Sequence, residues 1–376
     1  MLGIMNIGQP TLLVDSERVK RNIRRMAEKA KGSGVRFRPH FKTHQSAYIG
    51  ELYRQIGIRS ICVSSVDMAE YFADNGWDDI TLLVPVNWLQ IDRINALAQR
   101  IKLGLHVESV ATAVFLAERL KHRVDIWIEI DSGRRRTGIW WEDIAAIERV
   151  AAAVHQPLMQ LQGILTFAGQ SYGARSRDEA AQIYDNTAAI MARIRSDLAA
   201  AGFTNLEISV GDTPSCSIKE ALTGIDEVRA GTLVFYDVMQ MKLGACTEDD
   251  IAIAVACPVI AKYPDRNELT IYGGAVHFSR DSIKLPDGTV IYGLITTLNN
   301  AGWNRTVEGC FVADLSQEIG AVRVSRDFFD QLNIGDVIAV LPVHACLTVN
   351  EMGRFTTLDG QTHRIMPRRN DAAFPG

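Results

Sequence analysis

The sequence predicts an α/β protein in which a (β/α)8 barrel is followed by a smaller, mainly antiparallel β-domain. Up to about residue 245, apolar strand-like runs alternate with amphipathic helical stretches, a pattern typical of a parallel sheet covered by helices. Beyond that point helical stretches become rare, and turn signals such as Pro-Asp-Arg-Asn at residues 264–267 separate short β-like runs. The length of 376 residues is also ordinary for two domains.

The barrel is expected to span residues 9–245. It opens with a turn and a short buried strand, after which Asp15 or Ser16 can cap a helix that runs to about Lys31. A strand leading to Lys42 is followed by strands predicted at residues 60–65, 80–85, 103–107, 124–130, 161–167, 206–210 and 228–235, and by helices at 45–56, 67–75, 89–100, 110–120, 142–154 and 177–201. Eight or nine strands over roughly 230 residues fit a closed barrel better than an open sheet.

The β-domain is expected to span residues 246–367. Its strands are predicted at residues 255–263, 268–276, 290–298, 309–315, 320–324 and 337–341. Residues 368–376 resemble a loose tail, because they combine charged residues, alanines, proline and glycine at a chain end.

The bulk composition excludes several classes of protein. A net charge of −4 without a concentrated basic region argues against nucleic acid as the main partner. No apolar stretch reaches the length of a membrane span, and the first nine residues lack the basic start and apolar run of a secretion signal. The cysteines, at positions 62, 216, 246, 257, 310 and 346, show no paired framework. These features favour a cytoplasmic protein with free thiols.

The most informative stretch is Arg-Pro-His-Phe-Lys-Thr-His at residues 38–44, which follows a β-rich run. Because side chains alternate across a strand, one face is expected to carry Arg38, His40, Lys42 and His44. Crowded cations favour the neutral form of an amine, and a neutral lysine is a nucleophile able to form a Schiff base. The spacing alone leaves open a solvated basic strand or a phosphate-binding patch.

Polar and glycine-rich stretches follow several predicted barrel strands, where the functional loops of such a barrel lie. Residues 130–138 carry three consecutive arginines framed by glycines, which could cradle an anion or form a solvated loop. Residues 209–215 and 229–232 combine glycine with hydroxyl side chains, and such segments can present backbone N–H groups to a phosphate. Residues 167–172 end in a tyrosine, which after a strand more often serves packing than catalysis.

His344 and Cys346 lie two residues apart at the end of an apolar strand, so both can point to one side. Imidazole and thiolate together suit Zn²⁺. The alternative from spacing alone is a buried histidine beside a small apolar cysteine. The other histidines and cysteines show no ligand spacing and are interpreted as packing or surface residues.

These motifs, in their order over residues 9–350, resemble those of the D-serine dehydratase/D-threonine aldolase group. This group consists of fold-type III pyridoxal-phosphate enzymes related to alanine racemase. The stretch at residues 38–44 resembles the family's Schiff-base segment, so the resemblance implies that Lys42 holds pyridoxal phosphate. Residues 131–138 are similar to the family's Asp-x-Gly-x-x-Arg-x-Gly motif, which implies that Arg136 lies near the cofactor's phenolic oxygen. Tyr172 resembles a cofactor-contacting tyrosine, and the family has histidine where this chain has Gln170.

The resemblance also assigns residues to the cofactor phosphate and to a metal. The residues implied to bind the phosphate are Gly211, Thr213, Gly231 and Thr232. By similarity to alanine racemases, Arg229 is implied to approach the pyridine nitrogen. D-serine dehydratases carry His-x-Cys at residues 344–346 and bind zinc there, whereas D-threonine aldolases are associated with His-x-Asp. The implied zinc on His344 and Cys346 keeps positions open for substrate.

The resemblance therefore implies a pyridoxal-phosphate- and zinc-dependent dehydratase of a small D-3-hydroxy amino acid. Lys42 would remove the α-proton, zinc would bind the 3-hydroxyl, and the products would be a 2-oxo acid and ammonia. The alternatives are a D-threonine aldolase that releases glycine and an aldehyde, a racemase, or a non-catalytic cofactor-binding protein. A head-to-tail homodimer is also expected, in which the β-domain of one subunit covers the barrel mouth of another and brings the metal pair to Lys42.

Overall fold

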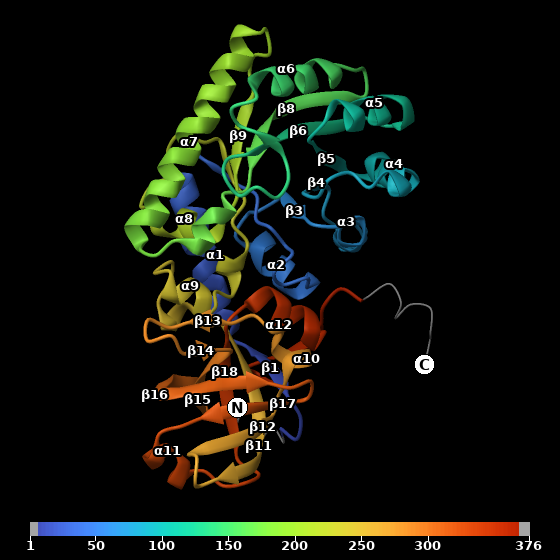
Figure 1. Cartoon of the computed structure of the whole chain (residues 1–376). Coiled ribbons are helices and arrows are strands. Elements are labelled where there is room, and N and C mark those ends of the chain that lie inside the picture. The colour runs from blue at the N-terminus through green and yellow to red at the C-terminus, as the bar shows by residue number, and fades with distance from the viewer. Residues whose placement is uncertain (1–6, 368–376) are drawn as a thin grey trace.

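The computed structural model describes residues 7–367. A barrel surrounded by helices lies above an antiparallel β-domain in Figure 1, and the two units are stacked along the long axis of the molecule. The predicted (β/α)8 barrel and the predicted antiparallel β-domain are both confirmed. None of the helices in residues 7–367 combines the length and hydrophobicity of a membrane span.

The barrel is a closed parallel sheet. Its strands are β2 (Arg36–Phe37), β3 (Ile61–Val63), β4 (Asp79–Leu82), β5 (Lys102–Val107), β6 (Val124–Asp131), β8 (Met159–Thr166), β9 (Glu207–Val210) and β10 (Glu227–Val228). They are hydrogen-bonded in the order β2-β10-β9-β8-β6-β5-β4-β3, and β7 (Ile139–Trp140) pairs with β6 off this path. A parallel bridge between His40 and Cys62 joins the two ends of the order. The barrel therefore closes directly before Lys42.

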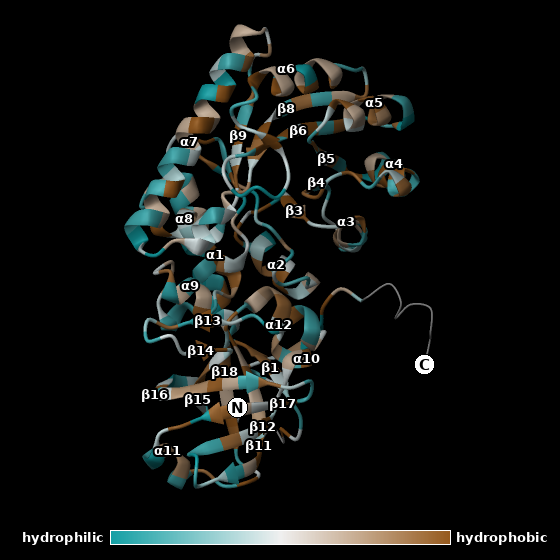
Figure 2. Ribbon diagram, viewed as in Figure 1, coloured by the Kyte–Doolittle hydropathy of each residue, from teal (hydrophilic) through white to brown (hydrophobic). Residues whose placement is uncertain are grey.

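Helices cover the outside of the barrel. They are α1 (Ser16–Gly32), α2 (Ala47–Gln55), α3 (Val66–Asp74), α4 (Ile91–Arg100), α5 (Val110–Arg119), α6 (Ile144–Ala153), α7 (Arg177–Ala200) and α8 (Thr213–Ile218). The predicted cap of α1 is confirmed, because the Asp15 side chain accepts hydrogen bonds from the backbone N–H groups of Glu17 and Arg18. Hydrophilic and hydrophobic residues alternate along the helices in Figure 2, and the buried hydrophobic residues of α1, Val19, Ile23, Met26 and Ala30, recur at helical spacing.

The β-domain is a second closed sheet. Its ring consists of β12 (Glu268–Tyr272), β17 (Ile319–Arg323), β16 (Gly302–Leu315), β15 (Gly293–Asn299), β18 (Val337–Pro342) and β11 (Ile253–Tyr263), and β11 pairs back to β12. The smaller elements are β13 (Ile283–Lys284), β14 (Val290–Ile291), β19 (Arg354–Thr357), β20 (Thr362–Arg364), α9 (Val238–Lys242), α10 (Ala275–Phe278), α11 (Arg326–Gln331) and α12 (Ala345–Met352). The predicted tail, residues 368–376, lies outside the described residues.

The first and last strands expected in the barrel differ from the prediction. The first strand, β1 (Thr11–Val14), pairs antiparallel with β11 and parallel with β19, so it joins the β-domain sheet although it precedes the barrel. A short apolar run fits a buried position in either sheet, and the sequence could not distinguish them. The strand predicted at residues 228–235 ends at Val228, and a short 3-10 helix, η4 (Thr232–Val234), follows.

The two units meet at the carboxyl ends of the barrel strands. The loop after β2 contacts α12, which lies directly below α2 in Figure 1. The backbone N–H of Ala345 donates to Asp237 Oδ2 at 2.9 Å, and Met366 N donates to Gln45 O at 2.6 Å. The β-domain therefore borders the mouth of the barrel within one chain.

Candidate active site

A cavity of about 420 Å³ lies where the carboxyl ends of the barrel strands meet the β-domain. All the residues predicted for the site belong to its lining: Lys42, Arg136, Tyr172, Gly211, Thr213, Arg229, Gly231, Thr232, His344 and Cys346. The structure thus brings together residues that are spread over most of the sequence. The roles assigned to them stay predictions.

Lys42 lies in a turn and not at the end of a continuous strand. Strand β2 ends at Phe37, and residues 41–44 form a turn in which Gln45 N donates to Phe41 O at 3.0 Å. Pro39 lacks the N–H that a strand ladder requires, which favours this break. His40 and Lys42 both line the cavity. The predicted alternation of four cationic side chains on one face is therefore wrong.

The other two members of the predicted face lie elsewhere. Arg38 is buried beneath the site, where it donates to Glu227 at 2.8 Å and to Asp79 at 2.5 Å. His44 is buried against Phe41, with ring centroids 4.3 Å apart, and burial lowers its pKa to about 3. Arg38 thus lies in an ion pair and His44 in an aromatic cluster, and neither side chain lines the cavity.

His40 is the immediate neighbour of Lys42. Its Nδ1 accepts a hydrogen bond from the backbone N–H of Lys42 at 3.2 Å, and its Nε2 lies 3.4 Å from Ser64 Oγ. Removal from water lowers the pKa of His40 well below its usual value, and the charges of Lys42 and Arg229 lower it further. His40 is therefore a neutral ring at pH 7, and it contributes a wall of the cavity without adding a cation.

The two predicted phosphate segments lie side by side and fit a phosphate. The Thr213 hydroxyl accepts a hydrogen bond from Thr232 N at 3.0 Å, which ties the start of α8 to η4. A Cβ at Gly231 would lie 2.6 Å from His40 O, so only glycine permits this close approach of two backbones. Closely packed backbone N–H groups at helix starts favour an anion. The residues present therefore suit the phosphate of pyridoxal phosphate.

Arg229 lies on the floor of the cavity in a fixed orientation. Its Nε donates to Ser209 Oγ at 2.7 Å, and its Nη2 donates to Thr166 O at 2.7 Å. Ser209 in turn donates to Glu227 at 2.7 Å. Burial raises the pKa of Glu227, but the Arg38 and Arg36 guanidinium groups outweigh it, so the pKa is lowered. A buried chain of charged hydrogen bonds thus holds Arg229 in place.

His344 and Cys346 also differ from the predicted placement. Strand β18 ends at Pro342, His344 is the N-cap residue of α12, and Cys346 lies in the first turn of that helix. The Cys346 Sγ lies 3.2 Å from the hydroxyl of Thr43, the residue after Lys42. The expectation that a second subunit must bring the pair to Lys42 is therefore wrong, because one chain supplies both.

The donor set of this pair fits a divalent metal. His344 Nδ1 lies 2.5 Å from Asp281 Oδ2, so Nε2 is the ring nitrogen that could bind a metal. A carboxylate on the second nitrogen of a metal-binding histidine is the usual arrangement, and it fixes the ring. Within residues 7–367 no group of three or more His, Cys, Asp or Glu side chains is placed to hold a metal. A metal here would therefore keep positions open for substrate.

The pKa values of His344 and Cys346 also favour metal binding. Burial alone would raise the pKa of Cys346, but the hydrogen bond and charge of His344, together with the Lys42 ammonium, lower it to about 7. Burial alone would lower the pKa of His344, but Cys346, Asp237 and Asp281 raise it to about 9. The lowered pKa of Cys346 favours the thiolate that a metal requires, and metal binding would displace the proton of His344.

Sequence reasoning did not identify Asp281 as a lining residue, and it named Arg134 only as one of three arginines that could cradle an anion. Of the two residues considered in the loop after β8, Tyr172 lines the cavity and Gln170 does not. Asp281 lies 63 residues before His344, and no spacing signal links them. The Gln170 amide donates to Ser132 O at 3.4 Å, outside the cavity lining.

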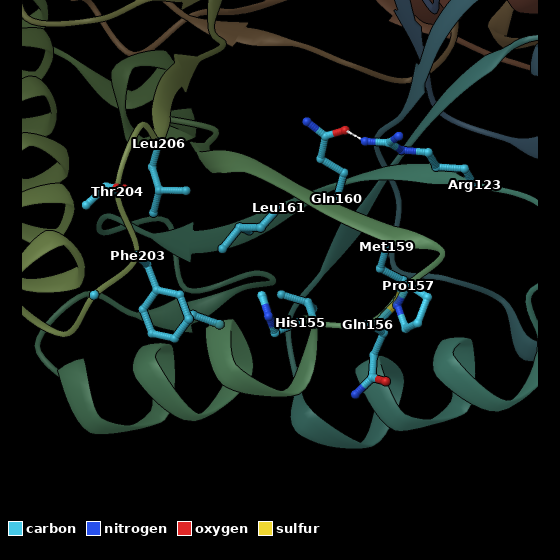
Figure 3. A pocket seen from close by; sticks show the side chains of 13 residues that line it. Arg123, His155, Gln156, Pro157, Met159, Gln160, Leu161, Phe203, Thr204 and Leu206 are labelled. Carbon is cyan, nitrogen blue, oxygen red and sulfur yellow. Dashed lines mark hydrogen bonds between the residues drawn. The ribbon is translucent and has the colours of Figure 1, made fainter.

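Cavity size alone would have pointed to another place. A larger cavity, of about 700 Å³, lies at the amino ends of β6 and β8, the opposite end of the barrel. Figure 3 shows the side chains that line it. Its ionisable lining residues in the described part of the chain are Arg123 and His155, and Arg123 is hydrogen-bonded to Gln160. Because this lining offers no cluster of reactive groups, the smaller cavity is the candidate active site.

Known proteins resemble this chain over nearly its whole length. A family model described as the alanine racemase N-terminal domain matches residues 14–238, and a serine dehydratase domain matches residues 252–358. The chain is 30% identical over 360 residues to D-threo-3-hydroxyaspartate dehydratase of Delftia sp. strain HT23, covering 92% of each chain. It is 27% identical over 371 residues to D-serine dehydratase of Dictyostelium discoideum, again covering 92% of each.

The structural comparison agrees. A metal-free cysteine-to-alanine variant of D-threo-3-hydroxyaspartate dehydratase has a TM-score of 0.89 and 29% identity, over 97% of this chain and 98% of that one. The chain therefore belongs to the alanine racemase-like, fold-type III pyridoxal-phosphate enzymes, in the group of the D-serine dehydratases and D-threonine aldolases.

Proposed function

We propose that this protein is a pyridoxal-phosphate- and metal-dependent dehydratase of a small D-3-hydroxy amino acid, which it converts to a 2-oxo acid and ammonia. One observation carries the proposal. Lys42 and the His344–Cys346 pair line the same cavity, although the contact between Thr43 and Cys346 spans 303 residues of sequence. A nucleophilic lysine and a soft metal-ligand pair on one small cavity suit removal of a proton at Cα and loss of a hydroxyl at C3.

Most of the predicted site residues have a role in this proposal. When bound, pyridoxal phosphate supplies an electron sink and a divalent metal supplies a Lewis acid. Lys42 would hold the cofactor covalently, and its Nζ, once released, would accept the Cα proton. The Gly211–Thr213 and Gly231–Thr232 segments would hold the phosphate, and Arg136 the phenolic oxygen. His344 and Cys346 would hold the metal, most simply Zn²⁺.

The surroundings favour such chemistry. Tyr172 is a lining residue whose pKa burial raises, so its phenol stays protonated and can donate a hydrogen bond. Met239 and Leu347 add apolar lining between barrel and β-domain. A partly apolar cavity strengthens the interactions of charged groups inside it and limits competing reactions with water.

The test is a product assay on purified protein supplied with pyridoxal phosphate and Zn²⁺. D-serine, D-threonine and D-threo-3-hydroxyaspartate are each incubated, and 2-oxo acid, ammonia and glycine are measured. We expect 2-oxo acid and ammonia in equal amounts, with a loss of several orders of magnitude in Lys42→Ala. Borohydride should fix the cofactor to Lys42. Glycine and an aldehyde would indicate an aldolase, inversion at Cα a racemase, and cofactor binding without any product a binding protein.

We also propose a homodimer, on the family resemblance, with a complete Lys42 and His344–Cys346 set in each subunit. Static light scattering measures the mass in solution directly. A mass of one chain at full activity would overturn this part of the proposal and leave the chemistry untouched.

A further inference from the structure

Arg134 is a charged lining residue for which the proposed function gives no role. Of the three consecutive arginines after β6, Arg135 turns away and places its guanidinium 3.4 Å from the centre of the Trp140 ring. Arg136 and Arg134 both line the cavity. No side chain in residues 7–367 forms a hydrogen bond or an ion pair with the Arg134 guanidinium.

The placement of Arg134 is built into two loops. Asp131 Oδ1 accepts hydrogen bonds from the backbone N–H groups of Gly133 at 2.9 Å and Arg135 at 3.0 Å, which fixes the backbone on both sides of Arg134. On the neighbouring loop, a Cβ at Gly169 would lie 3.0 Å from Arg134 Cδ. The absence of a side chain at Gly169 therefore gives the Arg134 stem room to pass beside the cavity wall.

The acids of the cavity do not neutralise this cation. Asp212 accepts hydrogen bonds from Ser171 at 2.8 Å and from the backbone and side chain of Ser215. Asp281 is paired with His344. Arg134 lines the cavity and is exposed to solvent. A guanidinium on such a residue that lacks an acidic partner is suited to an anionic ligand, and a carboxylate matches its planar fork with two parallel hydrogen bonds.

We propose that Arg134 binds a carboxylate of the substrate. This inference rests on the proposed function, because it concerns the same cavity and substrate class. Two substrate carboxylates could form this pair of hydrogen bonds with Arg134. One is the α-carboxylate, present in every amino acid substrate, and the other is a carboxylate on C3, present in 3-hydroxyaspartate and absent from serine. In the second case Arg134 would select acidic D-3-hydroxy amino acids over D-serine.

The test uses D-alanine and D-aspartate, which lack the hydroxyl that elimination requires. Their Kd values for the holoenzyme are measured by calorimetry for wild type, Arg134→Gln, Arg134→Lys and Arg135→Gln. Loss of a charged hydrogen-bond pair typically weakens binding by roughly 10- to 100-fold. An increase of this size for both analogues in Arg134→Gln assigns the α-carboxylate, and an increase for D-aspartate alone assigns the C3 carboxylate. Arg134→Lys should recover part of the affinity.

Arg135→Gln is the matched control, because it removes the same charge from the same loop outside the cavity, and it should bind like wild type. Equal Kd values for wild type and Arg134→Gln with both analogues, or no binding by wild type, would overturn the inference. The KM values for D-serine and D-threo-3-hydroxyaspartate should change in the same pattern, with a smaller change in kcat. If no 2-oxo acid forms although binding depends on Arg134, the proposed function fails and the assignment of Arg134 stands.

Discussion

The Asp281 carboxylate controls the orientation of His344. Its Oδ2 lies 2.5 Å from His344 Nδ1, and both side chains border the cavity. Replacing Asp281 with Asn removes the charge and keeps the shape. Loss of the carboxylate that holds a metal-binding histidine typically weakens metal affinity by about 10- to 100-fold. We therefore expect Asp281→Asn to bind Zn²⁺ that much more weakly, as measured by competition with a chromophoric chelator.

The cofactor provides the internal control for Asp281→Asn. Pyridoxal phosphate should bind the variant with wild-type affinity, because its predicted ligands lie on the barrel loops. Unchanged Zn²⁺ affinity would show that the Asp281 contact does not serve the metal.

Glu227 is the residue on which acid stability should depend. Its carboxylate is buried between Arg38 and Arg36, at 2.8 and 2.7 Å, and its pKa is lowered below the usual 4.5. A lowered folded-state pKa means that the stabilisation is present above the unfolded pKa and is lost as the pH falls through the folded value. The free energy of unfolding should therefore decline below about pH 4.5, as measured by urea denaturation.

The variant Glu227→Gln tests this directly. Removing one partner of a buried ion pair typically costs about 3–5 kcal/mol, so we expect a loss of that order at pH 7 and a flatter acid branch. Glu207→Gln is the matched control. Glu207 also bonds to Arg36, but its side chain is 34% exposed against 1% for Glu227, and an exposed pair contributes about 0–1 kcal/mol. Similar losses in both variants would contradict the account.

At the residue scale, the sequence predicted residues that line the cavity but not the residues that hold them in position. Lys42, His344 and Cys346 could be selected because their residue types and spacing carry chemistry and resemble a family motif. Asp281 and Glu227 could not, since their importance arises from contacts that span 63 and 189 residues. The position of Arg38 was mispredicted for the same reason, because its side chain pairs with Glu227 and does not line the cavity.

At the scale of elements, the start of α8 and η4 form the predicted phosphate site together. The hydrogen bond from Thr232 N to the Thr213 hydroxyl joins them. Thr213→Val keeps the shape and removes the acceptor, so the spacing of the two loops is no longer fixed. A hydrogen bond of this kind contributes about 0.5–1.5 kcal/mol, and we expect a fall of roughly 3- to 10-fold in pyridoxal-phosphate affinity by equilibrium dialysis.

Thr213→Ser retains the hydroxyl and should bind the cofactor like wild type. Equal affinities for the Val and Ser variants would show that this link does not shape the site. Gly231 is a poorer test, because a side chain there would meet the backbone of His40 at 2.6 Å. Overpacking of this kind typically destabilises by about 1–3 kcal/mol, so stability and cofactor binding would change together.

Periodicity predicted most helices and strands, because burial against a sheet imposes a visible pattern on ten or more residues. It did not fix the place or the end of some short strands. Strand β1 was expected but assigned to the barrel, and the strand expected to lead to Lys42 ends at Phe37, because runs of four and two residues show neither the sheet that they join nor where they stop. The helix start at Ala345 was also not predicted, since apolar residues continue from β18 past Pro342 into α12.

At the scale of the whole molecule, the chain crosses between its two units at both ends of the barrel sequence. Strand β1 belongs to the β-domain, the barrel follows, and β11 returns next to β1. The β-domain is therefore fixed against the barrel mouth from two sides. This arrangement explains why residues 303 positions apart, Thr43 and Cys346, are in contact without a second subunit.

The central claim is that the cofactor lysine and the metal pair of one chain act on the same substrate. The most direct measurement is the rate of 2-oxo acid formation from a D-3-hydroxy amino acid before chelation, after chelation and after addition of Zn²⁺. The account predicts that chelation abolishes the reaction, that Zn²⁺ restores it, and that borohydride still labels Lys42 in the chelated protein. His344→Ala and Cys346→Ala should each behave like chelated wild type. Full-rate formation of 2-oxo acid by the chelated protein would contradict the claim.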